Sequence, residues 1–199
     1  VFAFERQLLQ NAFLRANQKW DQNLYIEKKP KSLNELKIGI LGLGNVGNKA
    51  ANAFLRFGCE VFVCDVDHDK MIGFSNCFSE KNWPEMLSFV DYFVITVSDK
   101  NSINMINQEI FRRMNTNLCL VNVSRASVMD ENAFIKLLKE KRIRGAILDV
   151  FNQEPLKRTS IYWKLENVVV TPHIAGNINL VFLQIANHFV DEIKNTINV

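Results

Sequence analysis

The chain alternates short apolar runs with longer segments whose apolar residues recur every three or four positions. Six runs rich in β-branched and aromatic residues follow one another after residue 37: IGIL, EVFVCD, DYFVITV, NLCLVNV, GAILDV and NVVVTP. Nearly continuous apolar runs of this length are typical of strands that are buried on both faces. Because helical segments separate them, the pattern predicts an α/β fold with a doubly wound parallel sheet and helices on both faces.

The segments between these runs carry recognisable helix ends. The Ala-rich segment from Asn45 to Phe57 stops at Gly58, a residue suited to a left-handed C-cap. The segment from Asp130 to Lys141 begins with an acid and ends with basic residues, as the helix dipole favours. Two amphipathic helices are predicted near the ends of the chain, one at about Leu180–Lys194 and one with Leu9, Phe13, Ala16 and Trp20 on a single face.

A polar stretch, DQNLYIEKKPKSLNELK, separates the first helix from the strand-rich part of the chain. It contains Pro30 and predicts a linker. We therefore expect three parts: a helix and linker at residues 1–34, an α/β domain at residues 35–176, and a C-terminal helix at residues 177–199.

Composition narrows the classes of function. The hydrophobic fraction of 48%, the charged fraction of 23% and the net charge of +3 are typical of a globular protein and do not indicate binding to nucleic acid or to a membrane. No apolar stretch reaches the ~20 residues of a membrane span. Since Cys59, Cys64, Cys77 and Cys119 form no C-x-x-C pair, we expect reduced core thiols and a cytoplasmic location. No cluster has metal-ligand spacing, so no metal site is predicted.

The first predicted strand leads into three glycines with an informative spacing. Gly42, Gly44 and Gly47 form G-x-G-x-x-G between a strand and a helix, and the next strand ends at an acid eighteen residues after Gly47. Gly42 would permit the tight turn, Gly44 would let a pyrophosphate approach the backbone, and Gly47 would let the helix pack closely. The amides around Asn45 and Val46 would hold the phosphates. This context favours a Rossmann-type dinucleotide-binding fold over a purely structural turn.

Asp65 is the acid at the end of that second strand. A carboxylate there accepts hydrogen bonds from the adenosine ribose hydroxyls and repels a 2′-phosphate. No arginine lies just after it, although His68 and Lys70 are close enough in sequence to cradle a phosphate. We therefore expect NAD in preference to NADP as the cofactor, and we interpret Asp67 as a solvated turn acid.

Three later segments place polar residues at the ends of apolar strands, which is where an open parallel sheet binds ligands. They are NVSRAS (122–127), LDVFNQEPL (148–156) and VTPHIAG (170–176). In this order after the glycine turn, and within the longer runs VMDENAFIKLLKEKRIRGAILDVFNQEP and VVVTPHIAG, they resemble the D-isomer-specific 2-hydroxyacid dehydrogenase family across essentially the whole chain. The resemblance implies that residues 35–176 are an NAD-binding domain and that the flanking helices lead to a substrate domain, which we expect to be largely absent from this chain.

The resemblance also implies roles for individual residues. Arg125 matches the family's substrate arginine, whose planar fork can bind a 2-oxo acid bidentately. His173 matches the acid/base that exchanges a proton with the substrate carbonyl oxygen, and Glu154 matches the acid that pairs with this histidine. Asp149 matches the residue that engages the nicotinamide carboxamide, and Val97 stands where an adenine contact is expected.

These assignments lead to an expected function. We expect an NAD-dependent oxidoreductase, or its cofactor domain, that transfers hydride between NADH and a small 2-oxo or 2-hydroxy acid such as glyoxylate or hydroxypyruvate. The resemblance implies a homodimer formed through the cofactor domain. The alternative is a non-catalytic NAD(H)-binding regulatory or corepressor-like protein of the same fold, against which the joint presence of Arg125, Glu154 and His173 argues. Formate oxidation is disfavoured because that branch of the family has glutamine in place of Glu154.

Two positions depart from the family's pattern. Ala126 replaces the glycine that usually follows the substrate arginine, and its methyl group would crowd the turn if the turn needs a positive φ. The sequence ITVSDK stands where the family usually has His-x-Pro. These differences leave a divergent specificity open, and the missing substrate domain predicts low turnover by the isolated chain, because an open site neither excludes water nor orients the substrate.

Overall fold

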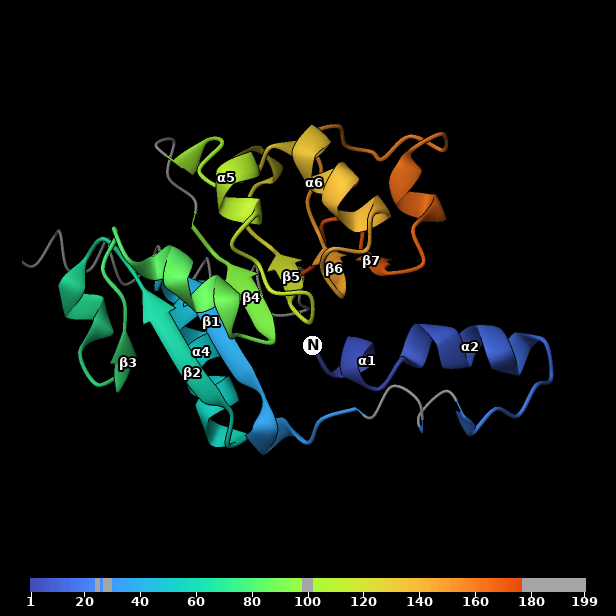
Figure 1. Cartoon of the computed structure of the whole chain (residues 1–199), viewed down its shortest axis with the longest axis horizontal. Helices are drawn as coiled ribbons and strands as arrows, with labels where there is room; N and C mark the ends of the chain where they lie inside the picture. Colours follow the sequence, from blue (N-terminus) through green and yellow to red (C-terminus); the bar gives the residue numbers. More distant parts are fainter. Residues whose placement is uncertain (24–25, 27–29, 98–101, 177–199) are drawn as a thin grey trace, which may run out of the picture.

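A seven-stranded parallel sheet forms the centre of the computed structural model, which describes residues 1–23, 26, 30–97 and 102–176 (Figure 1). The strand order is β3-β2-β1-β4-β5-β6-β7, and every neighbouring pair is parallel. The strands are β1 (Lys37–Leu41), β2 (Glu60–Cys64), β3 (Asn76–Cys77), β4 (Tyr92–Ile95), β5 (Cys119–Asn122), β6 (Gly145–Leu148) and β7 (Val168–Val170). The six predicted strands are confirmed, and the two-residue edge strand β3 is an addition.

The helices lie mainly between the strands in sequence. The α-helices are α1 (Phe2–Glu5), α2 (Leu8–Ala16), α4 (Asn45–Arg56), α5 (Gln108–Phe111) and α6 (Glu131–Lys139). Short 3-10 helices are η1 (Leu33–Glu35), η2 (His68–Met71), η3 (Trp83–Ser88), η5 (Ala126–Val128) and η6 (Ile161–Lys164). The helix predicted at about Leu180–Lys194 lies outside the described residues.

The two central helices end as their sequences predict. After α4, Gly58 adopts a φ of 81°, its amide donates to Leu55 O (2.9 Å) and the Cys59 amide donates to Phe54 O (3.1 Å). This is the Schellman arrangement, which a residue in the left-handed conformation permits. At the start of α6, the Asp130 side chain accepts a hydrogen bond from the amide of Ala133 (3.1 Å).

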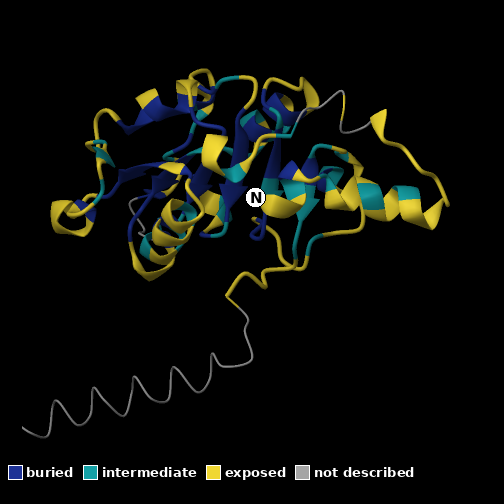
Figure 2. Ribbon diagram, turned by 90° about the horizontal axis from the view of Figure 1, so that it is seen from below, coloured by how far each residue is buried: buried dark blue, intermediate teal, exposed yellow. Residues whose placement is uncertain are grey.

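Successive residues of each strand point to opposite faces of the sheet, and helices cover both faces. On one face, Ile38, Ile40, Tyr92 and Val94 pack with Ala51 of α4 and with Phe4 of α1. On the other face, Phe93, Ile95 and Leu120 pack with residues of η3, α5 and α6. Figure 2 shows the buried strands between layers whose outer residues are exposed. The predicted doubly wound Rossmann-type sheet with helices on both faces is therefore confirmed.

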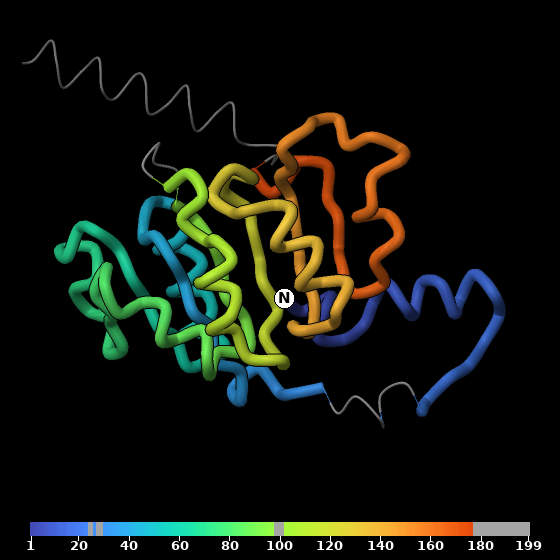
Figure 3. The backbone as a smooth tube through the Cα atoms, turned by 45° about the horizontal axis from the view of Figure 1, so that its top comes forward, coloured from blue at the N-terminus to red at the C-terminus, as the bar shows by residue number. Residues whose placement is uncertain are grey.

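The predicted first helix is wrong in its extent. Gln7 adopts a left-handed φ of 50° and separates α1 from α2, while Gln18, with a φ of 53°, follows the end of α2. Trp20 therefore lies beyond the helix, and its side chain is 88% exposed. Leu9 and Phe13 are also exposed. Figures 1 and 3 show α2 projecting beyond the sheet, so its apolar residues have little to pack against in the part of the chain that the structure describes.

Glu5 anchors α1 to the amino ends of the strands. Its side chain is only 5% exposed, and Oε2 accepts hydrogen bonds from the hydroxyl of Tyr92 (2.6 Å) and from Nη1 of Arg144 (2.9 Å). Oε1 accepts the amide hydrogen of Lys31 (2.9 Å), so the same carboxylate also holds the linker. Burial alone would raise the pKa of Glu5, but the bonds from Tyr92, Arg144 and Lys31 outweigh it and lower the pKa.

Three of the four cysteines behave as predicted. Cys59, Cys64 and Cys119 are buried free thiols, whereas Cys77 is exposed. Within the described residues, no helix has the length and apolar content needed to cross a membrane. The same part of the chain contains no group of three or more His, Cys, Asp or Glu side chains arranged to hold a metal ion.

Candidate functional site

The predicted site residues follow the carboxyl ends of the strands. Because the sheet is wholly parallel, the loops after β1, β2, β4, β5, β6 and β7 emerge at one edge. The strand order reverses between β1 and β4, and an open α/β sheet binds its ligand at such a reversal. The glycine turn after β1 and the residues after β4 lie on the two sides of this point.

The glycine turn closes tightly against the end of β4. Gly42 has a φ of 94°, a conformation that side chains disfavour, and Thr96 Oγ1 donates to its carbonyl oxygen (2.7 Å). A Cβ on Gly47 would collide with the carbonyl oxygen of Gly42 and with Thr96 Oγ1, so α4 can approach the turn only with glycine there. A Cβ on Gly44 would meet nothing within 4 Å, which leaves that stretch of backbone open to a ligand.

Asn45 and Val46 form the first turn of α4, and Gly44 is its N-cap. The first amides of a helix have no partner within the helix, and the helix dipole concentrates positive charge at them. Val46 is 59% exposed, so this end of α4 faces outward beside the glycine turn. The arrangement suits an anionic group.

Asp65 braces the glycine turn, a contact that sequence reasoning did not anticipate. The residue is 8% exposed; Oδ2 accepts the amide hydrogen of Leu43, and Oδ1 accepts that of Asp67 (2.8 Å). Because a carboxylate has about four acceptor positions, these two bonds leave acceptor capacity for a ribose hydroxyl. Lys70 Nζ lies 3.7 Å from Asp65 Oδ1.

Val97 lies directly against the glycine turn. A Cβ placed on Gly42 would be 2.9 Å from Val97 Cγ1, and the Val97 side chain is partly buried against the core. The residues that follow, 98–101, lie outside the described part of the chain. Val97 is therefore placed beside the predicted nucleotide site.

The loop after β5 is organised by Asn122, whose role the sequence analysis missed. Asn122 is fully buried; its Oδ1 accepts from the amide and the hydroxyl of Ser124 (both 3.0 Å), and its Nδ2 donates to Arg125 O (3.0 Å). The turn so formed presents Arg125 at the edge of the sheet, where the side chain is exposed and Nη1 donates to Ser124 O (2.7 Å). A buried polar residue at the end of an apolar strand is the signal that could have indicated this role.

Ala126 does not strain this loop. It begins the 3-10 helix η5 and does not adopt a positive φ. The crowding considered for a methyl group at this position therefore does not arise, and the chain tolerates alanine after Arg125.

Glu154 and His173 form a hydrogen-bonded pair across the loops after β6 and β7. Glu154 Oε2 lies 2.8 Å from His173 Nδ1, and Glu154 Oε1 accepts the amide hydrogen of Phe151 (2.9 Å). The hydrogen bond with His173, followed by that from Phe151, lowers the pKa of Glu154. The Glu154 carboxylate therefore holds the imidazole ring through a hydrogen bond at Nδ1, and Nε2 remains for another partner.

The loop that carries His173 is held by Asp149. This residue is 2% exposed; Oδ1 accepts from Thr171 Oγ1 (2.5 Å) and from the amide of Ile174 (3.0 Å), and Oδ2 accepts from the amide of Ala175 (2.9 Å). Burial would raise the pKa of Asp149, but these hydrogen bonds outweigh it and lower the pKa. Between the bonded residues, His173 adopts a left-handed φ of 54°.

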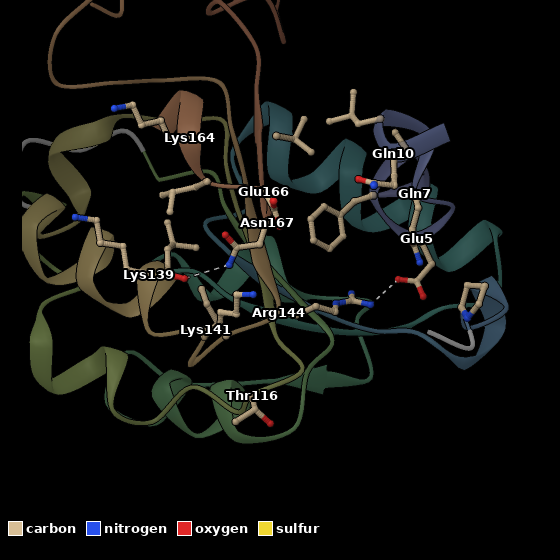
Figure 4. A pocket seen from close by; sticks show the side chains of 18 residues that line it. Glu5, Gln7, Gln10, Thr116, Lys139, Lys141, Arg144, Lys164, Glu166 and Asn167 are labelled. Carbon is tan, nitrogen blue, oxygen red and sulfur yellow. Dashed lines mark hydrogen bonds and ion pairs between the residues drawn. The ribbon is translucent and has the colours of Figure 1, made fainter. Parts of the chain in front are cut away.

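The structure therefore brings Glu154 and His173 into direct contact and places Arg125 and the glycine turn at the same edge of the sheet. A cavity of about 650 Å³ lies elsewhere, at the amino ends of β5, β6 and β7, and Figure 4 shows Glu5 and Arg144 pointing toward one another in its wall. The residues lining this cavity include none of the predicted site residues. The site is thus a set of loops on the opposite edge of the sheet from this cavity.

Comparison with known proteins agrees with this geometry. The sequence profile described as "D-isomer specific 2-hydroxyacid dehydrogenase, NAD binding domain" matches residues 1–175. A glyoxylate reductase from Korarchaeum cryptofilum is 39% identical over 143 residues, which cover 70% of this chain and 42% of that protein. A 2-ketogluconate reductase from Gluconobacter oxydans is 32% identical over 195 residues, or 97% of this chain and 61% of that protein.

Solved structures show the same relationship. A D-isomer specific 2-hydroxyacid dehydrogenase from Xanthobacter autotrophicus Py2, in complex with NADPH and MES, matches with a TM-score of 0.75 at 28% identity. The match covers 87% of this chain and 54% of that one. This chain therefore spans about half the length of the relatives that it matches.

Proposed function

Because the chain belongs to the D-isomer specific 2-hydroxyacid dehydrogenase family, we propose that it is the cofactor-binding part of an NAD-dependent oxidoreductase that reduces a small 2-oxo acid. The observation that carries the proposal is the Glu154–His173 pair, at the same sheet edge as the glycine turn. Within this proposal, residues 35–176 form the NAD-binding domain, and residues 1–34 and 177–199 lead toward the substrate domain.

The residues of the glycine turn fit a dinucleotide. The backbone at Gly44 is open on the side where a pyrophosphate would approach, and the amides of Asn45 and Val46 lie at the start of α4. Asp65 would accept from the ribose, Val97 would contact the adenine, and Asp149 would face the carboxamide. When bound, the nicotinamide cofactor supplies or accepts the hydride.

His173 and Glu154 supply the proton chemistry of the proposed reaction. With Nδ1 directed at Glu154, the ring can hold a proton on Nε2 and give it to the substrate carbonyl oxygen during reduction. Glu154 stays ionised because its pKa is lowered, and its negative charge stabilises the protonated ring. In the oxidative direction the same nitrogen takes the proton back.

Arg125 is proposed to bind the substrate. Its exposed guanidinium can donate two parallel N–H···O hydrogen bonds to the carboxylate or the carbonyl oxygen of a 2-oxo acid. Among the described residues Arg125 donates from Nη1 to Ser124 O, and its other N–H groups are left for that purpose. Glyoxylate is a proposed substrate because the relative from Korarchaeum cryptofilum is named a glyoxylate reductase. Hydroxypyruvate is proposed beside it because a relative from Yersinia enterocolitica is named a glyoxylate/hydroxypyruvate reductase.

We propose NAD(H) as the preferred cofactor. Asp65 lies at the end of β2, where a carboxylate repels a 2′-phosphate. The relative from Xanthobacter autotrophicus Py2 was solved with NADPH, whereas the matching family domain is described as NAD binding, so both cofactors belong in the assay.

A homodimer formed through the cofactor domain, residues 35–176, and a reducing compartment complete the proposal. Leu8, Leu9 and Phe13 of α2 are each more than half exposed, and an exposed cluster of large apolar side chains is typical of a protein interface. Because α2 lies in residues 1–34, the partner proposed for this cluster is the substrate domain. Three buried free cysteines are compatible with a cytoplasmic location.

The proposal is tested by the oxidation of NADH and, in parallel, of NADPH, followed by the loss of reduced-nicotinamide absorbance, with glyoxylate, hydroxypyruvate and other 2-oxo acids. The assay uses this chain and, in parallel, the chain joined to any coding sequence that precedes it in the gene. We expect oxidation by the longer protein and loss of it in His173→Ala. NADH binding without oxidation of any 2-oxo acid would favour the regulatory alternative, and absence of NADH binding would reject both functions.

A further inference from the structure

Charged side chains gather after β2, around the acid proposed to hold the ribose. Asp65, Asp67 and Asp69 place three carboxylates there, and Lys70 in η2 is the cation that follows them. Lys70 Nζ lies 3.7 Å from Asp65 Oδ1 and 3.4 Å from Asp67 Oδ2. The ammonium is therefore shared between a buried acid and an exposed one.

Asp65 and Lys70 are fixed to different degrees. The Asp65 carboxylate is bonded to the amides of Leu43 and Asp67, so it cannot move without loosening the glycine turn. The Lys70 side chain is 45% exposed, and both of its N–O distances exceed the ~2.7–2.9 Å of a charge-assisted hydrogen bond. Exposed ion pairs of this kind contribute little to stability, so Lys70 can change partners at small cost.

The fixed position of Asp65 and the freedom of Lys70 would affect the binding of a cofactor that carries a 2′-phosphate. Hydroxyls of the ribose bind the acid at the end of β2, so a phosphate on the 2′ position would meet the Asp65 carboxylate with like charge. Lys70 is already beside that carboxylate, and an ammonium on a flexible four-carbon stem can pair with a phosphate as a point charge. The cation would compensate for the repulsion that the fixed acid creates.

We propose that Lys70 is a specificity-determining residue: it pairs with Asp65 and Asp67 when NAD(H) binds and turns to the 2′-phosphate when NADP(H) binds. The inference rests on the proposed dinucleotide function and extends it. The chain then accepts both cofactors, and it prefers NAD(H) because the Asp65 carboxylate stays tied beside the ribose. Removal of Lys70 should affect the phosphorylated cofactor selectively.

The test compares the binding of NADH and NADPH, which differ only in the 2′-phosphate, by their fluorescence. The proteins are the wild type, Lys70→Ala, Lys70→Arg and, as a matched control on α6 at a distance from β2, Lys139→Ala. We expect Lys70→Ala to weaken NADPH binding about tenfold, the scale of one hydrogen bond to a charged group, and to leave NADH binding unchanged. Lys70→Arg and Lys139→Ala should keep the wild-type ratio of the two affinities.

Three results would overturn the inference. If Lys70→Ala weakened the binding of NADH and NADPH by the same factor, Lys70 would only support the glycine turn. If Lys70→Ala changed neither affinity, Lys70 would have no role in selectivity. A wild type that binds NADH but not NADPH would show that the site does not tolerate the 2′-phosphate. In each case NADH binding by the wild type leaves the proposed function standing. A wild type that binds neither cofactor would remove the proposed function and the inference together.

Discussion

Glu154 holds the imidazole of His173 through Nδ1 at 2.8 Å, while its second carboxylate oxygen is held by the amide of Phe151. Replacement of Glu154 by Gln should keep a hydrogen bond to the ring but remove the charge that stabilises the protonated form. We expect kcat for 2-oxo acid reduction to fall about 100-fold, within the usual range for acid–base catalysis, with NADH binding retained. Steady-state kinetics and NADH fluorescence measure the two effects, and Glu140→Gln on the exposed end of α6 is the control.

The same pair predicts how Glu154 titrates. Because the bonds from His173 and Phe151 lower its pKa, Glu154 should remain ionised as the pH falls through 4.5, the ordinary value. Its contribution to folding is present above that value and is lost only as the pH falls through the lowered pKa. A ¹³C NMR titration of the Glu154 carboxyl group should give a midpoint below 4.5. A midpoint at or above the ordinary value would contradict this reading of the pair.

Thr171 should act on the reaction through Asp149. Its hydroxyl donates to Asp149 Oδ1, the oxygen that also receives the Ile174 amide, and His173 lies between these donors with a left-handed φ of 54°. Thr171→Val keeps the shape of the side chain and removes the hydroxyl, so the carboxylate loses one of the three bonds that it accepts from the described residues. We expect kcat to fall about tenfold and the free energy of unfolding to fall by about 1–2 kcal/mol.

Thr171→Ser provides the matched control for that prediction, since it restores the hydroxyl and should recover most of kcat. A merely structural role for Thr171 would lower stability in Thr171→Val while kcat, measured on the folded fraction, stayed the same. Equal kcat values for the valine and serine variants would therefore reject a positioning role.

The sequence predicts the sheet well because its strands are buried on both faces and therefore consist of nearly continuous apolar residues. The edge strand β3 was missed since Asn76 and Cys77 form no apolar run; the strand exists through backbone pairing with Phe62 and Val63. The first helix was drawn too long because its apolar period continues to Trp20, although Gln7 and Gln18 take left-handed conformations without glycine or proline to announce them.

The candidate site also has one part that the sequence predicts and one that it does not. The glycine spacing and the family motifs indicate Arg125, Glu154 and His173, but the hydrogen bonds that position such residues depend largely on which loops are adjacent in the fold. Asn122 bonds Ser124 and Arg125 in its own loop, so its buried polar side chain at the end of an apolar strand was a local signal. Thr171 could be recognised only from the adjacency of β6 and β7, which brings its hydroxyl to Asp149. The bond from Asp65 to Leu43 likewise joins residues from two different strand ends, and no local pattern encodes it.

Two glycines in one turn should respond differently to alanine. Gly44 faces open space, whereas a Cβ on Gly47 would collide with Gly42 O and Thr96 Oγ1. We expect Gly44→Ala to fold with nearly wild-type stability but to bind NADH at least about tenfold more weakly, because a methyl group would stand where the pyrophosphate approaches. Gly47→Ala should lose about 2–3 kcal/mol of unfolding free energy, as overpacking does, as well as NADH binding.

Urea denaturation and NADH fluorescence separate the two glycine variants. Gly73→Ala is an unsuitable control because of its φ of 93°, so Gly176→Ala, whose Cβ would also meet nothing within 4 Å, serves instead. If Gly44→Ala bound NADH as well as the wild type, the phosphates could not lie over this turn.

The buried charge at the amino edge of the sheet should make stability depend on acid. Glu5→Gln removes the carboxylate that pairs with the Arg144 guanidinium. Among the described residues, Nε and Nη2 of Arg144 have no hydrogen-bond partner, and the guanidinium lies over the rings of Phe4 and Tyr92. Removing one partner of a buried pair is costly, so the free energy of unfolding at pH 7 should fall by about 3 kcal/mol.

The sign of the pH effect follows from the lowered pKa of Glu5. Below its ordinary value of 4.5 the unfolded state binds the proton first, so acid removes the stability that the ionised Glu5 contributes. The difference between wild type and Glu5→Gln should be complete above pH 4.5 and shrink as the pH falls through the lowered pKa. Urea unfolding at pH 7 and at pH 4, with Glu140→Gln as the exposed control, measures it. A difference that grows on acidification would mean that Glu5 is protonated in the folded chain, and the network with Tyr92, Arg144 and Lys31 would then hold a neutral acid.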